Sequence, residues 1–366
     1  MGYRRQILPF DALRAMAAVL VMSSHVRDVL LQDWRPGFGP LTWAFYVLTG
    51  NGHPAVTVFF VLSGFWITKA VVERGESGTW SWGGFVVDRL TRLWMVLLPA
   101  LCLGALLDFV TFRVLHFPPP GYGAHSIPPD VETHFSPTWF AANALFLQGL
   151  FAPTFGSNGP LWSLANEFWY CLWFPALYIA AASRRVTLPA VLAMGTAMLF
   201  RSFLPGFVCW LCGSVLYVLS RRNGAVKPIW GAVSWLPLAV LFAIDHDSGS
   251  GVRDVALAAA CVLPFWWAKD WPFKTGAAVA AYGAGSSYSL YAFHFPLLAL
   301  TAAAIGLHER LRPSAAAIGG CMALCVALTV AAWGLSQLTE RHTRSVRLWL
   351  AGLGLDFGRL RAPEPS

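Results

Sequence analysis

The chain has 366 residues, of which 57% are hydrophobic and only 12% are Asp, Glu, Lys or Arg. A soluble domain carries about 25% charged residues, so a water-soluble globule of this composition would lack half of its usual solvating groups. The composition excludes a cytosolic enzyme, a disordered chain and, despite the formal net charge of +8, a nucleic-acid-binding protein. We interpret the chain as an integral membrane protein.

Ten apolar segments, some of them short, qualify as bilayer-crossing helices, which need about 20 mostly apolar residues. They cover residues 8–31, 54–72, 93–112, 160–182, 187–203, 206–220, 230–245, 253–268, 284–307 and 315–338. An eleventh stretch, 138–152, is shorter and bounded by Pro137 and Pro153, which favours a re-entrant or interfacial segment. The expected fold class is all-α, a polytopic bundle of about ten transmembrane helices.

The distribution of basic residues predicts how this bundle is oriented, because Lys and Arg accumulate in cytoplasmic loops. With ten spans and both termini cytoplasmic, the 26 basic residues divide into 18 inside, six outside and two within the first helix. Making 138–152 a full span would invert every later loop and move three basic clusters outside. We therefore expect residues 1–340 to form one transmembrane domain and 341–366 a cytoplasmic basic tail.

The first helix carries ionisable groups that are costly inside a bilayer and are therefore candidates for function. Arg14 and His25 are 11 residues apart, which returns them to within about 20° of the same face, roughly 16 Å apart along the axis. Asp11 and Asp28 extend this stripe by one turn at either end. The stripe predicts a hydrated or ligand-filled channel. The alternative is a structural Asp11–Arg14 pair with His25 at the outer interface.

His25 is the candidate general base, because a histidine can accept a proton near neutral pH without a large pKa shift. A neighbouring carboxylate, Asp28 or Glu167, is expected to orient its ring. Glu167 lies at the start of the fourth apolar segment and is followed by aromatic residues. A carboxylate there is favoured to face a cavity rather than lipid, with an interfacial helix cap as the alternative.

Three further positions have both a functional and a structural interpretation. Arg89 and Arg92 lie one helical turn apart, and two guanidiniums on one face can hold a phosphate group. Positive-inside anchoring explains these arginines equally well. His294 precedes Pro296 by two residues in the ninth segment. A structural histidine bonded to backbone groups freed by the proline is slightly favoured over a second site residue.

Cysteine usage gives no sign of a metal or redox site. The seven Cys residues all lie inside apolar runs. Cys209 and Cys212 form a CxxC pair, but no second pair or His cluster stands at zinc spacing. Packing residues are the favoured interpretation, and no metal is expected.

Five segments, in order along nearly the whole chain, resemble acyltransferase family 3, the membrane sugar O-acyltransferases. They are Phe10–Arg14 with His25, Phe59–Phe65, Arg89–Leu93, Pro160–Leu164 with Glu167 and Tyr170, and Ser287–Pro296. Each segment alone is weakly specific, whereas five in the same order on a ten-span chain are highly specific. The chain departs from the family pattern at Ala15, Trp94–Met95 and His342, which concerns backbone shape more than chemistry. The C-terminal hydrolase-like domain of some members is not expected here.

The resemblance implies transfer of an acyl group, usually acetyl, from cytoplasmic acyl-CoA to a sugar hydroxyl, in a multi-pass protein of a bacterial inner membrane. Family acceptors include exopolysaccharide and lipopolysaccharide units, peptidoglycan, Nod factors and macrolide sugars. The implied roles are CoA phosphate binding by Arg89 and Arg92, and passage of the pantetheine arm past Arg14. His25 would act as general base or, less favoured, as a transient acyl carrier, supported by Glu167. The remaining expected site residues are Asp11, Ser63, Trp162, Tyr288 and His294.

Two other function classes fit part of the pattern. A transporter or flippase for a sugar-linked lipid would also carry charges inside its spans, but it predicts inverted repeats, which we do not find in the sequence. A non-catalytic scaffold gives no reason for the polar stripe. The expected partners are the bilayer, acyl-CoA and a carbohydrate acceptor, without nucleic acid. The acceptor, the acyl length, direct transfer versus an acyl-enzyme, and the oligomeric state are left open.

Overall fold

A computed structural model describes residues 8–222, 228–244, 251–271 and 277–352, and the described part of the chain is helical with no strand. The α-helices are α1 (Leu8–Leu30), α2 (Pro40–Thr49), α3 (Gly52–Glu76), α4 (Trp82–Phe109), α5 (Pro137–Ala144), α6 (Trp162–Ser183), α7 (Leu188–Leu199), α8 (Leu204–Ser220), α9 (Pro228–Val233), α10 (Trp235–Ile244), α11 (Gly251–Ala268), α12 (Ala277–Ala304), α13 (Ala315–Leu338) and α14 (Thr343–Gly352). Short 3-10 turns precede α6 and α8, and another, η5 (Glu340–His342), joins α13 to α14. The all-α class is confirmed.

Each of the ten predicted segments overlaps a helix, and the seventh overlaps both α9 and α10. Five stretches in the described residues are long and apolar enough to cross a membrane: Pro40–Glu76, Trp82–Val114, Arg201–Ser220, Gly251–Ala268 and Ala315–Leu350. Helices α1, α6 and α12 are also long, with 23, 22 and 28 residues, but they carry more polar side chains. The chain is a helical membrane protein. The count of ten crossings and the side of each terminus stay predictions.

The stretch 138–152 does not form a spanning helix. Helix α5 ends at Ala144, and turns follow in which Phe146 and Gly149 have positive φ angles of 59° and 77°. A continuous helix through this stretch is therefore excluded, as predicted. Helix α2, which packs against α1 and α13, is an element that the sequence analysis missed.

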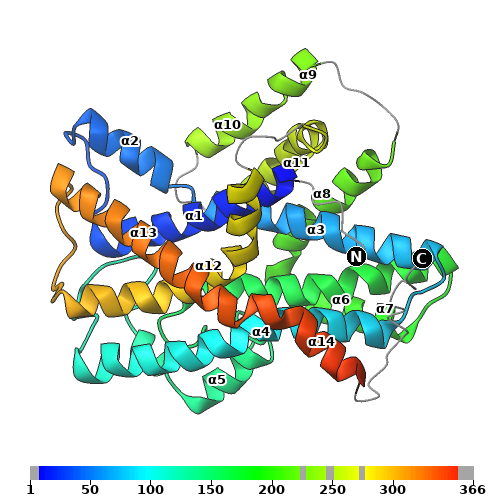
Figure 1. Cartoon of the computed structure of the whole chain (residues 1–366), viewed down its shortest axis with the longest axis horizontal. Coiled ribbons are helices and arrows are strands. Elements are labelled where there is room, and N and C mark those ends of the chain that lie inside the picture. The colour runs from blue at the N-terminus through cyan, green and yellow to red at the C-terminus, as the bar shows by residue number, and fades with distance from the viewer. Residues whose placement is uncertain (1–7, 223–227, 245–250, 272–276, 353–366) are drawn as a thin grey trace.

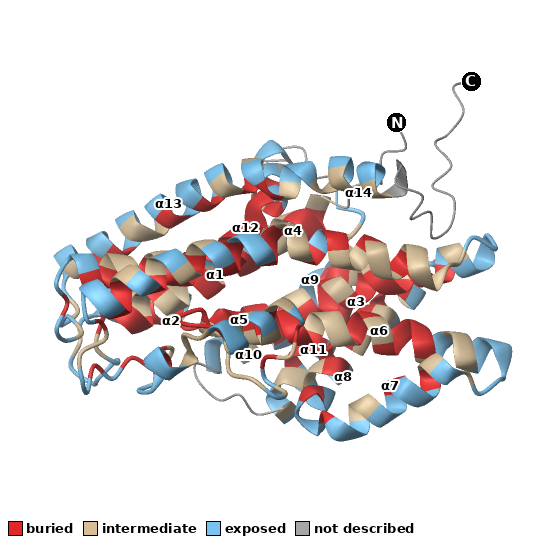
Figure 2. Ribbon diagram, turned by 90° about the horizontal axis from the view of Figure 1, so that it is seen from below, coloured by how far each residue is buried: buried red, intermediate tan, exposed pale blue. Residues whose placement is uncertain are grey.

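The buried core lies where α1, α3, α4, α6, α8 and α12 meet (Figure 1). Helix α1 packs along α12 more extensively than any other pair of elements. Figure 2 shows buried residues concentrated on α1, α3, α4 and α12, whereas α7 and α13 have broad exposed faces. The exposed side chains of α13 include Met322, Val326, Val330 and Trp333. So much contiguous apolar surface is rare on a soluble protein and suits contact with lipid.

Two glycines allow α3 and α8 to approach closely, as small residues do between membrane helices. A Cβ atom on Gly64 would lie 2.0 Å from the carbonyl oxygen of Trp210, and one on Gly213 would lie 2.0 Å from that of Val61. Any larger residue at either position would force the helices apart. Gly64 thus has a packing role, while its neighbour Ser63 points elsewhere.

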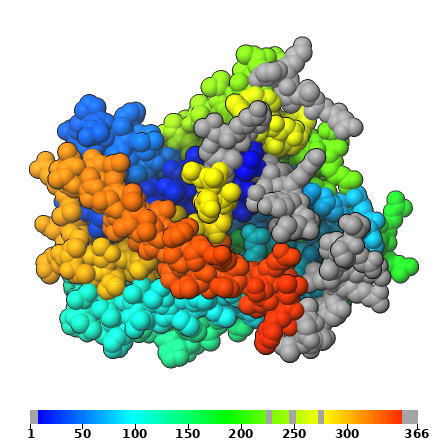
Figure 3. All heavy atoms as spheres, viewed as in Figure 1, coloured from blue at the N-terminus to red at the C-terminus, as the bar shows by residue number. Residues whose placement is uncertain are grey.

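The predicted basic tail begins as ordered structure. Helix α14 packs against the first turns of α4, and Figure 3 shows it continuing across the face that α13 crosses. Residues 353–366, with Arg359 and Arg361, lie outside the described residues. So do four other basic residues of the charge count, Arg4, Arg5, Lys227 and Lys274.

Candidate functional site

His25 and His294 form a pair across the interface of α1 and α12. The Nδ1 atom of His25 lies 2.9 Å from Nε2 of His294, and the two rings are within 16° of parallel. His294 is completely buried, and Phe295 meets the His25 ring edge-on at 5.2 Å between centroids. The sequence analysis slightly favoured a structural His294, whereas the structure places it in direct contact with the candidate base.

The hydrogen bonds of His294 determine how a neutral pair is protonated. Its Nδ1 atom lies 2.9 Å from the carbonyl oxygens of both Leu290 and Tyr291. Carbonyl oxygens only accept, so Nδ1 carries the hydrogen and, in a neutral ring, Nε2 is an acceptor. It accepts the hydrogen on Nδ1 of His25, which leaves the lone pair of His25 on Nε2. The pair therefore presents one unprotonated nitrogen to a reactant.

The expectation that a carboxylate orients His25 is wrong. Asp28 accepts hydrogen bonds from the backbone N–H and the hydroxyl of Ser126 instead. Glu167 accepts from the Ser63 hydroxyl at 3.2 Å. The physical reason for the first is the loop after α4, which crosses the end of α1 and supplies donors to the carboxylate. A second histidine, distant in sequence, occupies the place expected for an acid.

A second polar group, the arginine–carboxylate cluster, surrounds Arg14. We define it as Arg14, Arg92, Glu167 and Glu340. Arg14 interacts electrostatically with each of the other three. Asp11 makes an ion pair with Arg14 at 4.0 Å, as the structural alternative anticipated. The members come from α1, α4, α6 and η5, so the cluster joins four segments of the chain. Like charges are interspersed with opposite ones, which lowers the repulsion between them.

Glu340 is a member of the cluster that the sequence analysis did not select. Its Oε1 atom accepts the backbone N–H of Ser289 at 2.7 Å and the Ser289 hydroxyl at 2.8 Å. Glu340 also interacts electrostatically with Arg14 and Arg92. The available signal was an acidic residue directly after the last apolar segment, at the start of a basic stretch.

Ser63 and Tyr288 also line the arginine–carboxylate cluster. The Ser63 hydroxyl donates to Glu167 and accepts the indole N–H of Trp210 at 3.3 Å. Tyr288 interacts electrostatically with Glu167, and its hydroxyl donates to the carbonyl oxygen of Leu93 at 3.0 Å. Ser63 is thus held by two side chains, beside the packing glycine that follows it. Ser63 of α3 thus bonds a cluster member directly, whereas Tyr288 joins α12 to the backbone of α4 beside Arg92.

Arg89 and Arg92 lie one turn apart in the first half of α4, where Arg89 is half-buried and Arg92 is exposed. The Arg89 guanidinium lies 5.4 Å from the centre of the Phe85 ring. Both arginines interact electrostatically with Cys171 on α6. Both are therefore on the part of α4 that is near α6.

Trp162 joins neither polar group. Its ring stacks on His53 at 6.1 Å between centroids and 15° between planes. His53 in turn lies 2.9 Å from a carboxylate oxygen of Asp254 at the start of α11. Trp162 therefore belongs to a separate contact of α3, α6 and α11.

The loop before α6 is attached to the helix that carries His294. Pro296 has no N–H, so the carbonyl oxygen of Ala292, four residues earlier, loses its helical partner. The side-chain amide of Asn158 donates to that oxygen at 2.8 Å. In the same loop Ser157 donates its backbone N–H and its hydroxyl to the buried Asp108 of α4, at 2.8 and 2.6 Å. These bonds keep the histidine pair and the start of α6 in fixed register.

One group of described residues, Asp28, Asp33 and His125, is spaced closely enough to hold a metal ion. Arg310 lies 2.8 Å from Asp33 and 3.8 Å from Asp28, so a guanidinium already balances these carboxylates. The Arg310 hydrogen bond holds the pKa of Asp33 below its usual value. These ion pairs connect the C-terminal end of α1 to the loop before α13.

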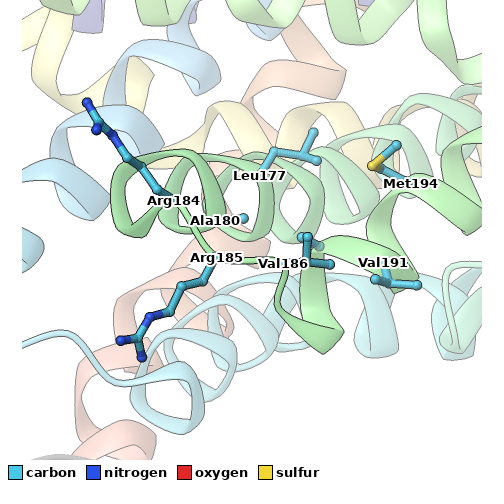
Figure 4. A pocket seen from close by; sticks show the side chains of 8 residues that line it. Leu177, Ala180, Arg184, Arg185, Val186, Val191 and Met194 are labelled. Atoms are coloured by element: carbon cyan, nitrogen blue, oxygen red, sulfur yellow. The ribbon is translucent and has the colours of Figure 1, made fainter.

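A surface cavity of about 270 Å³ lies between α6 and α7 (Figure 4). It is lined by Leu177, Ala180, Arg184, Arg185, Val186, Ala190, Val191 and Met194. Arg184 and Arg185 extend away from it in different directions (Figure 4). None of the predicted site residues lines this cavity.

Comparison with known proteins identifies relatives over most of this structure. The family model of acyltransferase family 3, described as an acyltransferase domain, matches residues 8–332. The chain is 28% identical over 161 residues to "Protein 2 in picA locus" of Rhizobium radiobacter, which covers 43% of this chain and 74% of that protein. No solved structure matches the chain.

Proposed function

Because the chain belongs to acyltransferase family 3, we propose that it transfers an acyl group, most simply acetyl, from cytoplasmic acyl-CoA to a hydroxyl of a sugar in an exported or cell-surface glycan. The observation that carries this proposal is the His25–His294 pair, which presents an unprotonated Nε2 atom. Such a nitrogen can take the proton of a hydroxyl nucleophile. The proposed location is a bacterial inner membrane, with ten spans and both termini in the cytoplasm.

The proposed reaction needs one base that later acts as an acid. Nε2 of His25 accepts the proton as the acceptor oxygen attacks the thioester carbonyl. The tetrahedral intermediate then collapses with loss of the thiolate of CoA, which receives this proton from His25. Nδ1 of His25 keeps its hydrogen bond to His294 throughout. His294 therefore holds the ring and the tautomer without changing its own protonation.

Binding of the donor is assigned to the arginine side of the site. Arg89 and Arg92 lie one helical turn apart and would hold phosphate groups of CoA through charge-assisted hydrogen bonds. Arg14 is on the same helix as His25, roughly 16 Å away along the axis, and would lie on the route of an extended arm toward the base. The negative charges of Glu167 and Glu340 limit the repulsion between Arg14 and Arg92.

The test measures transfer of labelled acetyl from acetyl-CoA to cell-envelope glycans in cells that produce the full chain. For His25→Gln we expect transfer to fall by about 1,000-fold, within the range of general base catalysis. The matched control is His308→Gln, an exposed histidine outside both polar groups, which should transfer as well as the unaltered chain. Transfer by a correctly inserted His25→Gln protein at the unaltered rate would contradict the mechanism.

A further inference from the structure

Asp88 is a buried acid directly before the first arginine of the proposed phosphate clamp. Its side chain is almost fully buried. Arg74, near the end of α3, donates to one carboxylate oxygen at 2.6 Å. Arg347 of α14 lies 3.1 Å from the other oxygen and also donates to the Asp88 backbone carbonyl at 3.3 Å. One carboxylate thus joins α3, α4 and α14.

A carboxylate at position 88 would weaken anion binding by the neighbouring arginines unless it forms ion pairs with other residues. Asp88 and Arg92 are four residues apart, the spacing at which an acid and a base pair on a helix surface. A carboxylate there competes with a phosphate group for the Arg92 guanidinium. It also adds a negative charge beside the incoming anion, which costs more in a partly buried site than in water.

Arg347 lies beyond residues 8–332, the part matched by the family model. It reaches Asp88 because α14, which follows η5 after the end of α13, packs against α4. One turn earlier on the same helix Arg344 is exposed and makes no ion pair with Asp88. Helix α14 therefore offers two arginines of equal charge, of which one contacts Asp88.

We propose that Arg347 is a positioning residue for the donor site. Together with Arg74 it holds the Asp88 carboxylate away from Arg92, so that this carboxylate does not compete with the phosphate groups of the acyl-CoA substrate for the Arg92 guanidinium. The choice of ligand rests on the proposed function. The contact between Arg347 and Asp88 does not.

Binding of coenzyme A itself tests this role without any acyl transfer. Titration calorimetry would use the full chain in detergent at low salt, with coenzyme A as the titrant. For Arg347→Gln we expect Kd to rise about fivefold, the size of effect that a partly buried ion pair supports. Arg344→Gln removes the same charge from an exposed position on α14, and its Kd should change by less than about twofold.

A second substitution separates competition from simple anchoring of α14. Asp88→Asn removes the competing charge, so Asp88→Asn combined with Arg347→Gln should regain the Kd of the unaltered chain. If Arg347 only anchors the helix, the double variant will bind as weakly as Arg347→Gln. That result would overturn the proposal.

The single Asp88→Asn variant gives an independent outcome even where Arg347→Gln does not fold. It should bind coenzyme A at least as tightly as the unaltered chain, and weaker binding would also overturn the proposal. An unaltered Kd in Arg347→Gln would do the same while leaving the proposed function intact. Failure of the unaltered chain to bind coenzyme A would instead overturn the donor assignment of the proposed function, and this proposal with it.

Discussion

The histidine pair and the arginine–carboxylate cluster share helix α1 but differ in how their polar atoms are satisfied. His25 and His294 bond to each other and to backbone carbonyls, with an aromatic ring beside them. Arg14 instead interacts with charged groups of both signs. A pair with neutral partners can exchange a proton without rearranging nearby charge. A charged cluster is suited to bind an anion. Under the proposed function, proton transfer and donor binding are therefore separate tasks of the two groups.

The largest effect on this contrast is expected from His294→Phe. Without an acceptor for the Nδ1 hydrogen, the His25 ring loses its orientation and its preferred tautomer, and we expect kcat to fall about 100-fold. His294→Gln, whose amide oxygen can accept that hydrogen, should lose less. Binding of coenzyme A should be unchanged in both variants. Weaker binding of coenzyme A in either one would show that the two groups are not separate.

An intermediate effect is expected from Arg92→Gln, which tests the role of the arginine–carboxylate cluster in donor binding. Loss of a charge-assisted contact to phosphate should raise the KM for acetyl-CoA about tenfold while kcat changes less. Steady-state kinetics with varied acetyl-CoA separates the two constants. Arg201→Gln, an exposed arginine before α8, is the control. A fall in kcat alone would place Arg92 in the chemistry of transfer rather than in binding.

The smallest effect is expected from Asp33→Asn, which lies outside both groups. Arg310 lowers the pKa of Asp33 in the folded protein. This ion pair therefore stabilises the fold above the unfolded-state pKa of about 4, and the contribution is lost as pH falls through the lower folded-state value. The thermal midpoint of Asp33→Asn should be slightly lower than that of the unaltered chain at pH 7, and the difference should shrink as the pH falls below about 4.

The control for this pH dependence is Glu309→Gln, an exposed acid near the same pair. Its thermal midpoint should follow that of the unaltered chain at every pH. A midpoint difference for Asp33→Asn that stays constant as the pH falls below about 4 would contradict the assignment. Acyl transfer at neutral pH should be the same for all three proteins, since the pair takes no part in either polar group.

The helices that carry most of the predicted site residues are not among the five most apolar stretches. Arg14 and His25 lie on α1, Glu167 on α6, and His294 on α12. The polar side chains on these helices lower their mean hydropathy. Such side chains are tolerated in a membrane protein because they face one another rather than lipid. Helix α13 shows the opposite pattern, with an apolar and widely exposed surface. Low hydropathy in a long helix was therefore itself a signal of the site, alongside the individual charges.

The sequence by itself determined the helical membrane class, the family and the residue types able to perform the chemistry, because these depend on composition and local spacing. The tertiary structure decided which side chains meet. Residues 25 and 294 are separated by 269 positions, so no local pattern could pair them or exclude Glu167 as the partner of His25. Glu340 interacts with Arg92, and Arg347 with Asp88, only because the segment after α13 packs against α4. Such contacts arise from helix packing, which brings together residues that are remote along the chain.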